Sequence, residues 1–225
     1  MRRKSARPVL GDAQRSAAWQ VQSLLLGYPD ETLLDSLPML ARVVSALPEA
    51  VGAPLQRVLS YLEPSRQLSA ATAYVDTFDH RKRFSPYLNW FFCGDTRRRG
   101  MALLKIKQVY LAAGSVPGDD ELPDHLAVVL EFASAHPVPG QRLLEEHRAS
   151  IEVMRMALRD ADSPWAGVLE SVSATLRPLH GDEREAVVRL IASGPPDEGV
   201  GLEPFAPPVH QPDMLGMPQM IGARR

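Results

Sequence analysis

The chain has 225 residues, of which 45% are hydrophobic and 23% are charged, and its formal net charge is -2. These values are ordinary for a globular protein with one large core, and the near-neutral balance argues against a general nucleic-acid binder. The single cysteine, Cys93, excludes an intrachain disulfide framework, and no apolar run approaches the roughly 20 residues that cross a bilayer.

The first residues, 1–12, are basic, and no apolar stretch of the kind found in a secretory signal follows them. Their composition is typical of a disordered arm. Together with the lone cysteine, which fits a reducing compartment, this start predicts a cytoplasmic protein.

From residue 13 to residue 193, apolar residues recur every three or four positions, and no segment alternates as a β-strand does. The pattern predicts an all-α fold: a single-domain helical bundle of about nine or ten helices. Pro38 is expected to bend or divide its helix, and residues 144–158 are expected to form one long helix.

The pattern also specifies buried faces and helix ends. The expected faces are Leu68, Ala71, Val75 and Phe78 in one helix, and Met101, Leu104, Gln108 and Leu111 in another. Gly114 is expected to close the second of these helices as its C-terminal glycine. Ser163-Pro164 should begin a later helix, and Asp182 should cap the last one.

Residues 194–225 differ, because seven prolines interrupt them and no apolar period runs through them. We expect a tail that is disordered or lies over the surface. Met214, Met217 and Met220 stand three apart in it, either as a sticky recognition motif or as part of an ordinary flexible end.

The sequence contains no GxxxxGK[ST] or GxGxxG loop, no CxxC pair and no HExxH motif. Asp76 and His80 are one helical turn apart, so they form either a metal pair without an obvious third ligand or a surface ion pair. Cys93 has no adjacent activating group and is expected to be a buried thiol. We therefore expect no cofactor, no metal and no enzymatic activity.

Eight basic residues lie between Arg81 and Lys107, and acidic residues follow at 119–131. Thr96 resembles an N-cap, which would place the arginine run 97–99 in a first helical turn. Each exposed positive charge there opposes the helix dipole by roughly 0.3–1 kcal/mol. Acidic partners must compensate, either internal carboxylates such as Asp119, Asp120 and Asp124 or groups on another protein.

Four blocks of this region resemble one family. They are YVDTFDHRKR (74–83), YL followed by aromatic residues (87–92), GDTRRRGMALLKIKQVYLAAG (94–114) and DDELPDHLAVVLEFA (119–133), with LLGYPD (25–30) near the start. In this order they are similar to the redox-enzyme maturation chaperones of the TorD/DmsD/NarJ family, and most specifically to its nitrate reductase delta-subunit (NarJ-type) branch. The resemblance covers about residues 16–160.

The resemblance implies an all-helical cytoplasmic chaperone that binds the apo catalytic (alpha) subunit of respiratory nitrate reductase, mainly through that subunit's N-terminal peptide. It would promote molybdenum cofactor insertion and complex assembly without joining the finished enzyme, and molybdenum cofactor biosynthesis proteins are further expected partners. An aromatic, charged surface suits an amphipathic peptide helix. The residues expected to bind the client peptide are Tyr74, Asp79, His80, Arg81, Tyr87, Trp90, Arg97, Arg98, Arg99, Leu122, Pro123, Asp124, His125 and Glu131.

His125 has two interpretations: a group that titrates near neutral pH and modulates the grip on the client, or a satisfied histidine at a helix start. Other functions also stay open on the residues alone. They are a chaperone for another molybdoenzyme, a hydrolase that uses Asp76, Asp79 and His80, and a helical regulator or scaffold. The lack of a nucleophile or ligand constellation argues against the hydrolase, and the lack of helix-turn-helix spacing argues against DNA binding.

Overall fold

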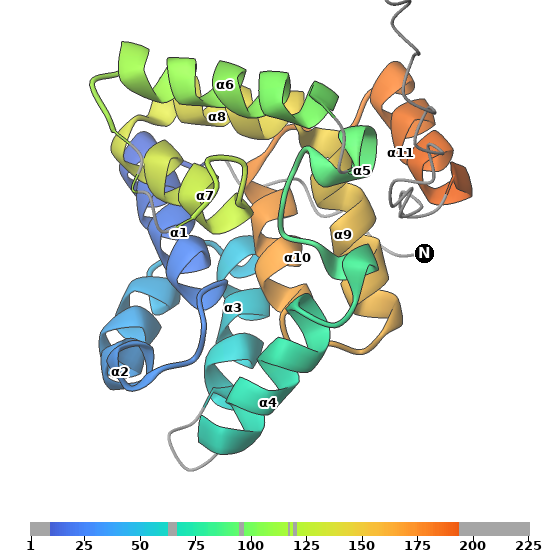
Figure 1. Ribbon diagram of the computed structural model, residues 1–225. Helices are drawn as coiled ribbons and strands as arrows, with labels where there is room; N and C mark the ends of the chain where they lie inside the picture. The colour runs from blue at the N-terminus through green and yellow to red at the C-terminus, as the bar shows by residue number, and fades with distance from the viewer. Residues whose placement is uncertain (1–9, 63–66, 95–96, 117, 119–120, 194–225) are drawn as a thin grey trace, which may run out of the picture.

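The computed structural model describes residues 10–62, 67–94, 97–116, 118 and 121–193. Within them, the regular structure consists of eleven α-helices, one 3-10 turn and no strand (Figure 1). The elements are α1 (Asp12–Leu25), α2 (Glu31–Ser45), α3 (Glu49–Tyr61), α4 (Gln67–Phe78), η2 (Lys82–Phe84), α5 (Trp90–Cys93), α6 (Arg97–Ala112), α7 (Leu126–Ala135), α8 (Pro137–Glu146), α9 (Arg148–Asp160), α10 (Ala166–Thr175) and α11 (Gly181–Ser193). The all-α prediction is confirmed, with eleven helices in the described ranges where the sequence indicated nine or ten. No helix in the described ranges is long and apolar enough to span a bilayer.

Residues 1–9 and 194–225, which hold most of the predicted arm and the whole predicted tail, lie outside the described residues, as do Thr96, Asp119 and Asp120. Leu10, which the sequence placed in the arm, is buried. Its carbonyl accepts a 3.2 Å hydrogen bond from Nη2 of Arg15, which fixes the start of α1.

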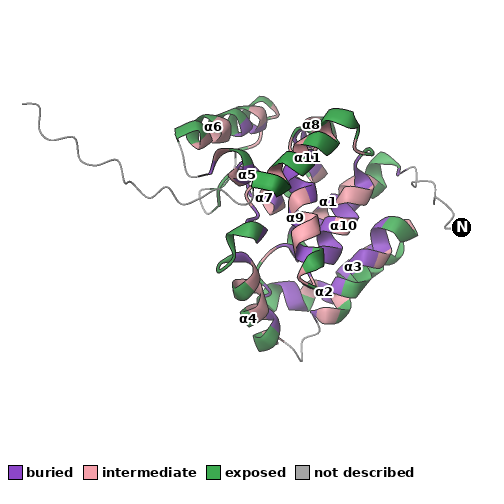
Figure 2. Cartoon of the chain, turned by 90° about the vertical axis from the view of Figure 1, so that its right-hand side faces the viewer, coloured by how far each residue is buried: buried purple, intermediate pink, exposed green. Residues whose placement is uncertain are grey.

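The centre of the bundle is formed by α1 and α10 (Figures 1 and 2). α1 packs along α7, and α10 packs along α3. Gly167 permits the close approach of α10 to α3, because a Cβ at that position would lie 2.6 Å from the carbonyl oxygen of Pro54. A buried polar chain crosses the same region: Gln22 Nε2 donates to Ser171 Oγ at 2.8 Å, and Ser171 Oγ donates to the Val51 carbonyl at 2.8 Å.

One helix differs from the prediction in its length. The expected long helix is divided at His147 into α8 and α9, and His147 Nε2 lies 3.2 Å from Asn89 Oδ1. This break places Arg148 in the interior, where its Nη2 lies 2.8 Å from Glu152 Oε1. Of the two outcomes expected at Pro38, a bend or a division, the division does not occur: α2 runs continuously through Pro38, which lies on its exposed side.

The buried faces of α4 and α6 also differ from the prediction. In α4 the buried residues are Ala70 and Phe78, whereas Leu68 is 82% exposed. In α6 they are Ile106 and Tyr110, and the expected residues Met101, Leu104 and Leu111 are exposed. α6 carries apolar residues on both sides, so its period alone does not select a face.

Polar contacts orient α6. The hydroxyl of Tyr110 donates a 2.8 Å hydrogen bond to the Pro123 carbonyl, which turns the Ile106 and Tyr110 side inward. Gly114 closes the helix end as predicted, with a φ of 81°. α10 begins at Ala166, after the Ser163-Pro164 pair. α11 begins at Gly181, so Asp182 lies in its first turn and is not its N-cap, contrary to the prediction.

α11 lies at the edge of the bundle (Figure 1) and packs mainly against α9. Val187 is its buried residue, and it stands apart from the continuous core. Leu190, half-buried, packs against that core. Burying one valine side chain stabilises a folded protein by about 1.5–3 kcal/mol, so apolar burial contributes little to the packing of α11 on the bundle.

α7 begins after His125, whose Nδ1 accepts a 3.2 Å hydrogen bond from the Ala127 amide. An accepting Nδ1 must be unprotonated. Burial lowers the pKa of His125 and outweighs the opposing charges of Glu121 and Asp124. Burial thus keeps His125 neutral at neutral pH, which favours the second interpretation, a satisfied histidine at a helix start.

We expect the free energy of unfolding to fall as the pH drops below about 6.5, because the unfolded chain takes up a proton at His125 that the folded chain resists. His125→Asn keeps an N-cap acceptor without a titrating ring, so it should remove that part of the slope. Urea unfolding of both proteins between about pH 7 and pH 5 measures the difference. Identical slopes would contradict this role for His125.

Candidate functional site

Two segments cross at the centre of the region that the sequence singled out. Residues 86–90 run beside residues 122–126: the Leu88 amide donates to the Asp124 carbonyl, and the Leu126 amide donates to the Pro86 carbonyl, each at 2.9 Å. Tyr87 and His125 are opposed in an isolated antiparallel bridge. We call these two segments, together with Arg99 of α6, the crossing.

Asp124 is the buried centre of the crossing, with no exposed surface. Its Oδ2 accepts a 3.1 Å hydrogen bond from the Asn89 amide, and its Oδ1 lies 3.9 Å from Nη2 of Arg99. That second separation is too long for a hydrogen bond. Burial raises the pKa of Asp124, although Asn89 and Arg99 both act to lower it. Asp124 therefore holds the crossing together and has no surface for a ligand to touch.

Tyr87 lies half-buried on the outer side of the crossing. Its hydroxyl donates a 2.9 Å hydrogen bond to Glu121 Oε1, and its ring meets the His125 ring edge-on at 5.3 Å. The Arg99 guanidinium lies 5.1 Å from the centre of the Tyr87 ring and 5.9 Å from that of Trp90. Such stacking fixes both rings. Burial and the hydrogen bond to Glu121 raise the pKa of Tyr87 to about 12, so its hydroxyl remains a donor.

A second tyrosine belongs to the same surroundings. Burial raises the pKa of Tyr74 to about 12, and the charges of Asp79 and Glu121 add to the effect. Glu121 thus influences both Tyr74 and Tyr87. Tyr28, which the sequence analysis did not propose, is 51% exposed and meets the Tyr74 ring edge-on at 5.6 Å. We define the tyrosine surface as Tyr28, Tyr74, Asp79, Tyr87, Glu121 and the 40% exposed Leu122.

The structure brings together half of the fourteen proposed residues in the crossing. These are Tyr87, Trp90, Arg99, Leu122, Pro123, Asp124 and His125. Tyr74 and Asp79 lie on the tyrosine surface. The remaining five, His80, Arg81, Arg97, Arg98 and Glu131, are exposed and lie outside the crossing. Of the three arginines in the first turn of α6, only Arg99 faces a carboxylate within the described residues.

The other residues that were considered for chemistry have ordinary surroundings. His80 Nδ1 lies 3.2 Å from Asp76 Oδ1, and both side chains are more than half exposed, at 65% and 58%. This is the geometry of a surface ion pair. No group of three metal-binding side chains is found among the residues that the structure describes. Cys93 is half-buried instead of buried.

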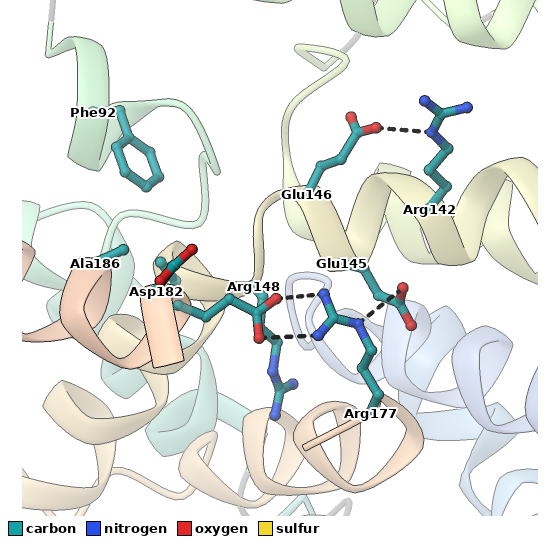
Figure 3. A pocket seen from close by; sticks show the side chains of 10 residues that line it. Phe92, Arg142, Glu145, Glu146, Arg148, Arg177, Asp182 and Ala186 are labelled. Atoms are coloured by element: carbon teal, nitrogen blue, oxygen red, sulfur yellow. Dashed lines mark hydrogen bonds and ion pairs between the residues drawn. The ribbon is translucent and has the colours of Figure 1, made fainter. Parts of the chain in front are cut away.

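Two cavities that sequence reasoning missed lie beside α11. The larger has a volume of about 480 Å³ and is lined by Phe92, Arg142, Glu145, Glu146, Arg148, Ala149, Arg177, Asp182, Glu183 and Ala186 (Figure 3). The smaller has a volume of about 300 Å³ and is lined by Arg83, Phe91, Val153, Met156, Ala157, Asp160, Leu190 and Ile191. No motif signals either cavity, because their lining comes from six separate parts of the chain: η2, α5, α8, α9, Arg177 and α11.

Comparisons with known proteins bear on this arrangement. The chain is 39% identical over 159 residues to the nitrate reductase-like protein NarX of Mycobacterium tuberculosis, which covers 70% of this chain but only 24% of that protein. The chain therefore spans about a quarter of that relative's length. It is 31% identical over 173 residues to the probable nitrate reductase molybdenum cofactor assembly chaperone NarJ of Bacillus subtilis, covering 74% of this chain and 92% of that one.

The fold has a counterpart among solved structures. A putative redox enzyme maturation protein from Archaeoglobus fulgidus matches with a TM-score of 0.54 at 21% identity, covering 76% of this chain and 97% of that chain. At that identity the likeness supports the fold alone. The sequence model of the nitrate reductase delta subunit matches residues 45–170, which include the whole crossing. The resemblance drawn from the residues is confirmed, and the chain belongs to the nitrate reductase delta subunit family.

Proposed function

We propose that this protein is a system-specific assembly chaperone. It binds the apo catalytic (alpha) subunit of respiratory nitrate reductase, promotes molybdenum cofactor insertion and complex assembly, and is not part of the finished enzyme. The observation that carries the proposal is the 31% identity to a probable assembly chaperone over 92% of that protein's length. Relatives with chaperone names also support a role without catalysis.

The N-terminal peptide of the catalytic subunit is the proposed ligand, and the tyrosine surface is its proposed site. Tyr87 has an orientation fixed by Arg99 and Glu121, so it is prepared for contact before the client arrives. Tyr28 and Leu122 add exposed apolar area beside it. An amphipathic helix laid on this surface gains both apolar contact and hydrogen-bonding partners.

Charge sets the direction of the bound helix. Asp79 and Glu121 make one side of the tyrosine surface acidic, whereas Arg97 and Arg98 are exposed on α6 beside Arg99. Opposite charges on two sides of a site favour one orientation of a polar ligand over the reverse. Asp124 and His125 are buried, so in this proposal they position Tyr87 and do not contact the peptide.

The proposed function also implies a cellular compartment. Cofactor insertion into the apo catalytic subunit precedes membrane docking of the enzyme, so the proposed place of action is the cytoplasm. Molybdenum cofactor biosynthesis proteins are the proposed source of the cofactor and therefore transient partners at that stage.

A synthetic peptide covering the N-terminal segment of the catalytic subunit should bind this chain and become helical. The expected dissociation constant is on the order of micromolar, as for other helices bound in surface grooves. Isothermal titration calorimetry measures the affinity, and circular dichroism measures the induced helix. A peptide of scrambled sequence is the control. Absence of heat and of added helicity at about 50 μM protein would refute peptide binding.

Arginine variants separate partner binding from stability. Arg98 is exposed, so Arg98→Gln should change the free energy of unfolding by less than about 0.5 kcal/mol while weakening peptide binding and flattening its salt dependence. Arg99→Gln removes the partner of buried Asp124 and should destabilise the fold by about 1–3 kcal/mol. Urea unfolding and calorimetric titration of both variants supply the two readouts.

The matched control for this pair is Lys107→Gln, which removes one exposed charge from the same helix at a position ten residues along from Arg97. It should leave both stability and peptide affinity unchanged. Marked destabilisation by Arg98→Gln with unchanged affinity would overturn the role of this side chain in client binding.

A further inference from the structure

α11 covers the bundle without completing its core. Of its thirteen residues only Val187 is buried, and Val188 and Ile191 are 64% and 48% exposed. The two cavities lie toward opposite ends of the helix: the larger is lined by Asp182, Glu183 and Ala186, and the smaller by Leu190 and Ile191. A helix with unfilled space at both ends fits its groove only through its middle.

The groove beneath α11 is mainly apolar at the smaller cavity and mainly charged at the larger one, and most of its lining comes from other elements. α9 supplies Val153, Met156 and Ala157, and the short helix α5 supplies Phe91 and Phe92, one to each cavity. α5 follows directly on the crossing in the chain, so one continuous segment contributes to both the candidate site and the groove. Both α5 and α9 fall within residues 45–170, the part that matches the family, whereas α11 lies beyond it.

An ion-pair relay holds the first turn of α11. Arg177 Nε lies 3.3 Å from Glu145 Oε2 of α8, and the same guanidinium pairs with Glu183 of α11. The His180 amide also donates to Glu183 Oε2 at 2.9 Å. Figure 3 shows Arg177 reaching Glu145, with Phe92 across the cavity. Arg177 is 42% exposed, so solvent can compete for this pair.

We propose that the groove between α5 and α9 is a second helix-binding site, and that α11 is its built-in, displaceable occupant. The chemistry of the partner follows from the occupant. It is an amphipathic helix with an acidic residue in its first turn for Arg177 and aliphatic residues four and seven positions later, as Glu183, Val187 and Leu190 are spaced in α11. The assignment of this helix to the catalytic subunit, at a segment other than its N-terminal peptide, rests on the proposed function.

The direct test uses two neighbouring valines in the full-length chain. Val187→Asp places a charge in the contact of α11 with the groove, whereas Val188→Asp places the same charge on its exposed side. The probe is a fluorescent peptide with the sequence of residues 180–193, followed by anisotropy. The dissociation constant should fall about tenfold or more for Val187→Asp relative to wild type, because a larger fraction of the grooves is open. Val188→Asp should bind as the wild type does.

Glu183→Gln is the second variant, since it loosens α11 without introducing a buried charge and leaves the Nη2 side of Arg177 available to the probe while Glu145 still pairs with its Nε. It should shift binding in the same direction by a smaller factor. A probe carrying the equivalents of Glu183→Gln and Val187→Asp together should not bind. Hydrogen exchange on all variants reports whether α11 is released. Release of α11 without tighter probe binding would overturn the proposal, and so would an α11 that stays protected in both loosened variants.

The identity of the partner has its own readout. Adding the apo catalytic subunit to the wild-type chaperone should increase hydrogen exchange in residues 181–193 and decrease it in residues 153–157. Binding of that subunit without any change in residues 181–193 would overturn the groove as its site and leave the proposed function standing. No binding of that subunit would instead refute the proposed function, while the peptide titration would still decide whether the groove accepts a helix.

Discussion

Burial of the Asp124 carboxyl group is the constraint on which the rest of the site depends. Its backbone and side chain bind the Leu88 and Asn89 amides, and its free oxygen faces Arg99. One residue thereby joins the segment before α5, the start of α7 and the first turn of α6. α6 needs such a link, because only Ile106 and Tyr110 are buried along its sixteen residues. The cost of burying the carboxyl appears in its raised pKa and is tolerated because three elements are positioned by it.

In the proposed function, this arrangement separates the residues that identify the family from those that would contact a client. The Pro-Asp-His sequence at 123–125 turns the chain, caps α7 and holds the crossing, and most of it is inside. On its outer side, the crossing exposes part of the Tyr87 ring, which is flanked by Arg99 and Glu121 and has Leu122 beside it. A residue can therefore be essential to binding through position alone. Substitutions at Asp124 or His125 report on the architecture, whereas substitutions at Tyr28 or Arg98 test the proposed contact.

Periodicity was sufficient to predict an all-α fold and the Gly114 helix end, because both follow from local rules. Periodicity did not predict the buried face of α6 or the helix break at His147, because tertiary polar contacts determine both. α6 has apolar residues on both sides, and the bond from Tyr110 to Pro123 selects the inner one. The helix break at His147 depends on Asn89, which is distant in sequence. Seven of the proposed site residues do lie together in the crossing. Periodicity did not group them; the family resemblance did. Tyr28 and the groove beneath α11 were not predicted, since no sequence signal marks an exposed aromatic contact or weak packing.

In the proposed function, the chain binds the catalytic subunit only before that subunit holds its molybdenum cofactor. Affinity purification of the tagged chaperone from nitrate-respiring cells tests it, with and without a block in molybdenum cofactor synthesis, followed by quantitative mass spectrometry. The account predicts that the catalytic subunit copurifies in greater amount from the blocked cells, because the apo form accumulates, and that assembled enzyme from unblocked cells lacks the chaperone. Recovery of the chaperone in constant proportion with the finished, cofactor-loaded enzyme would contradict it.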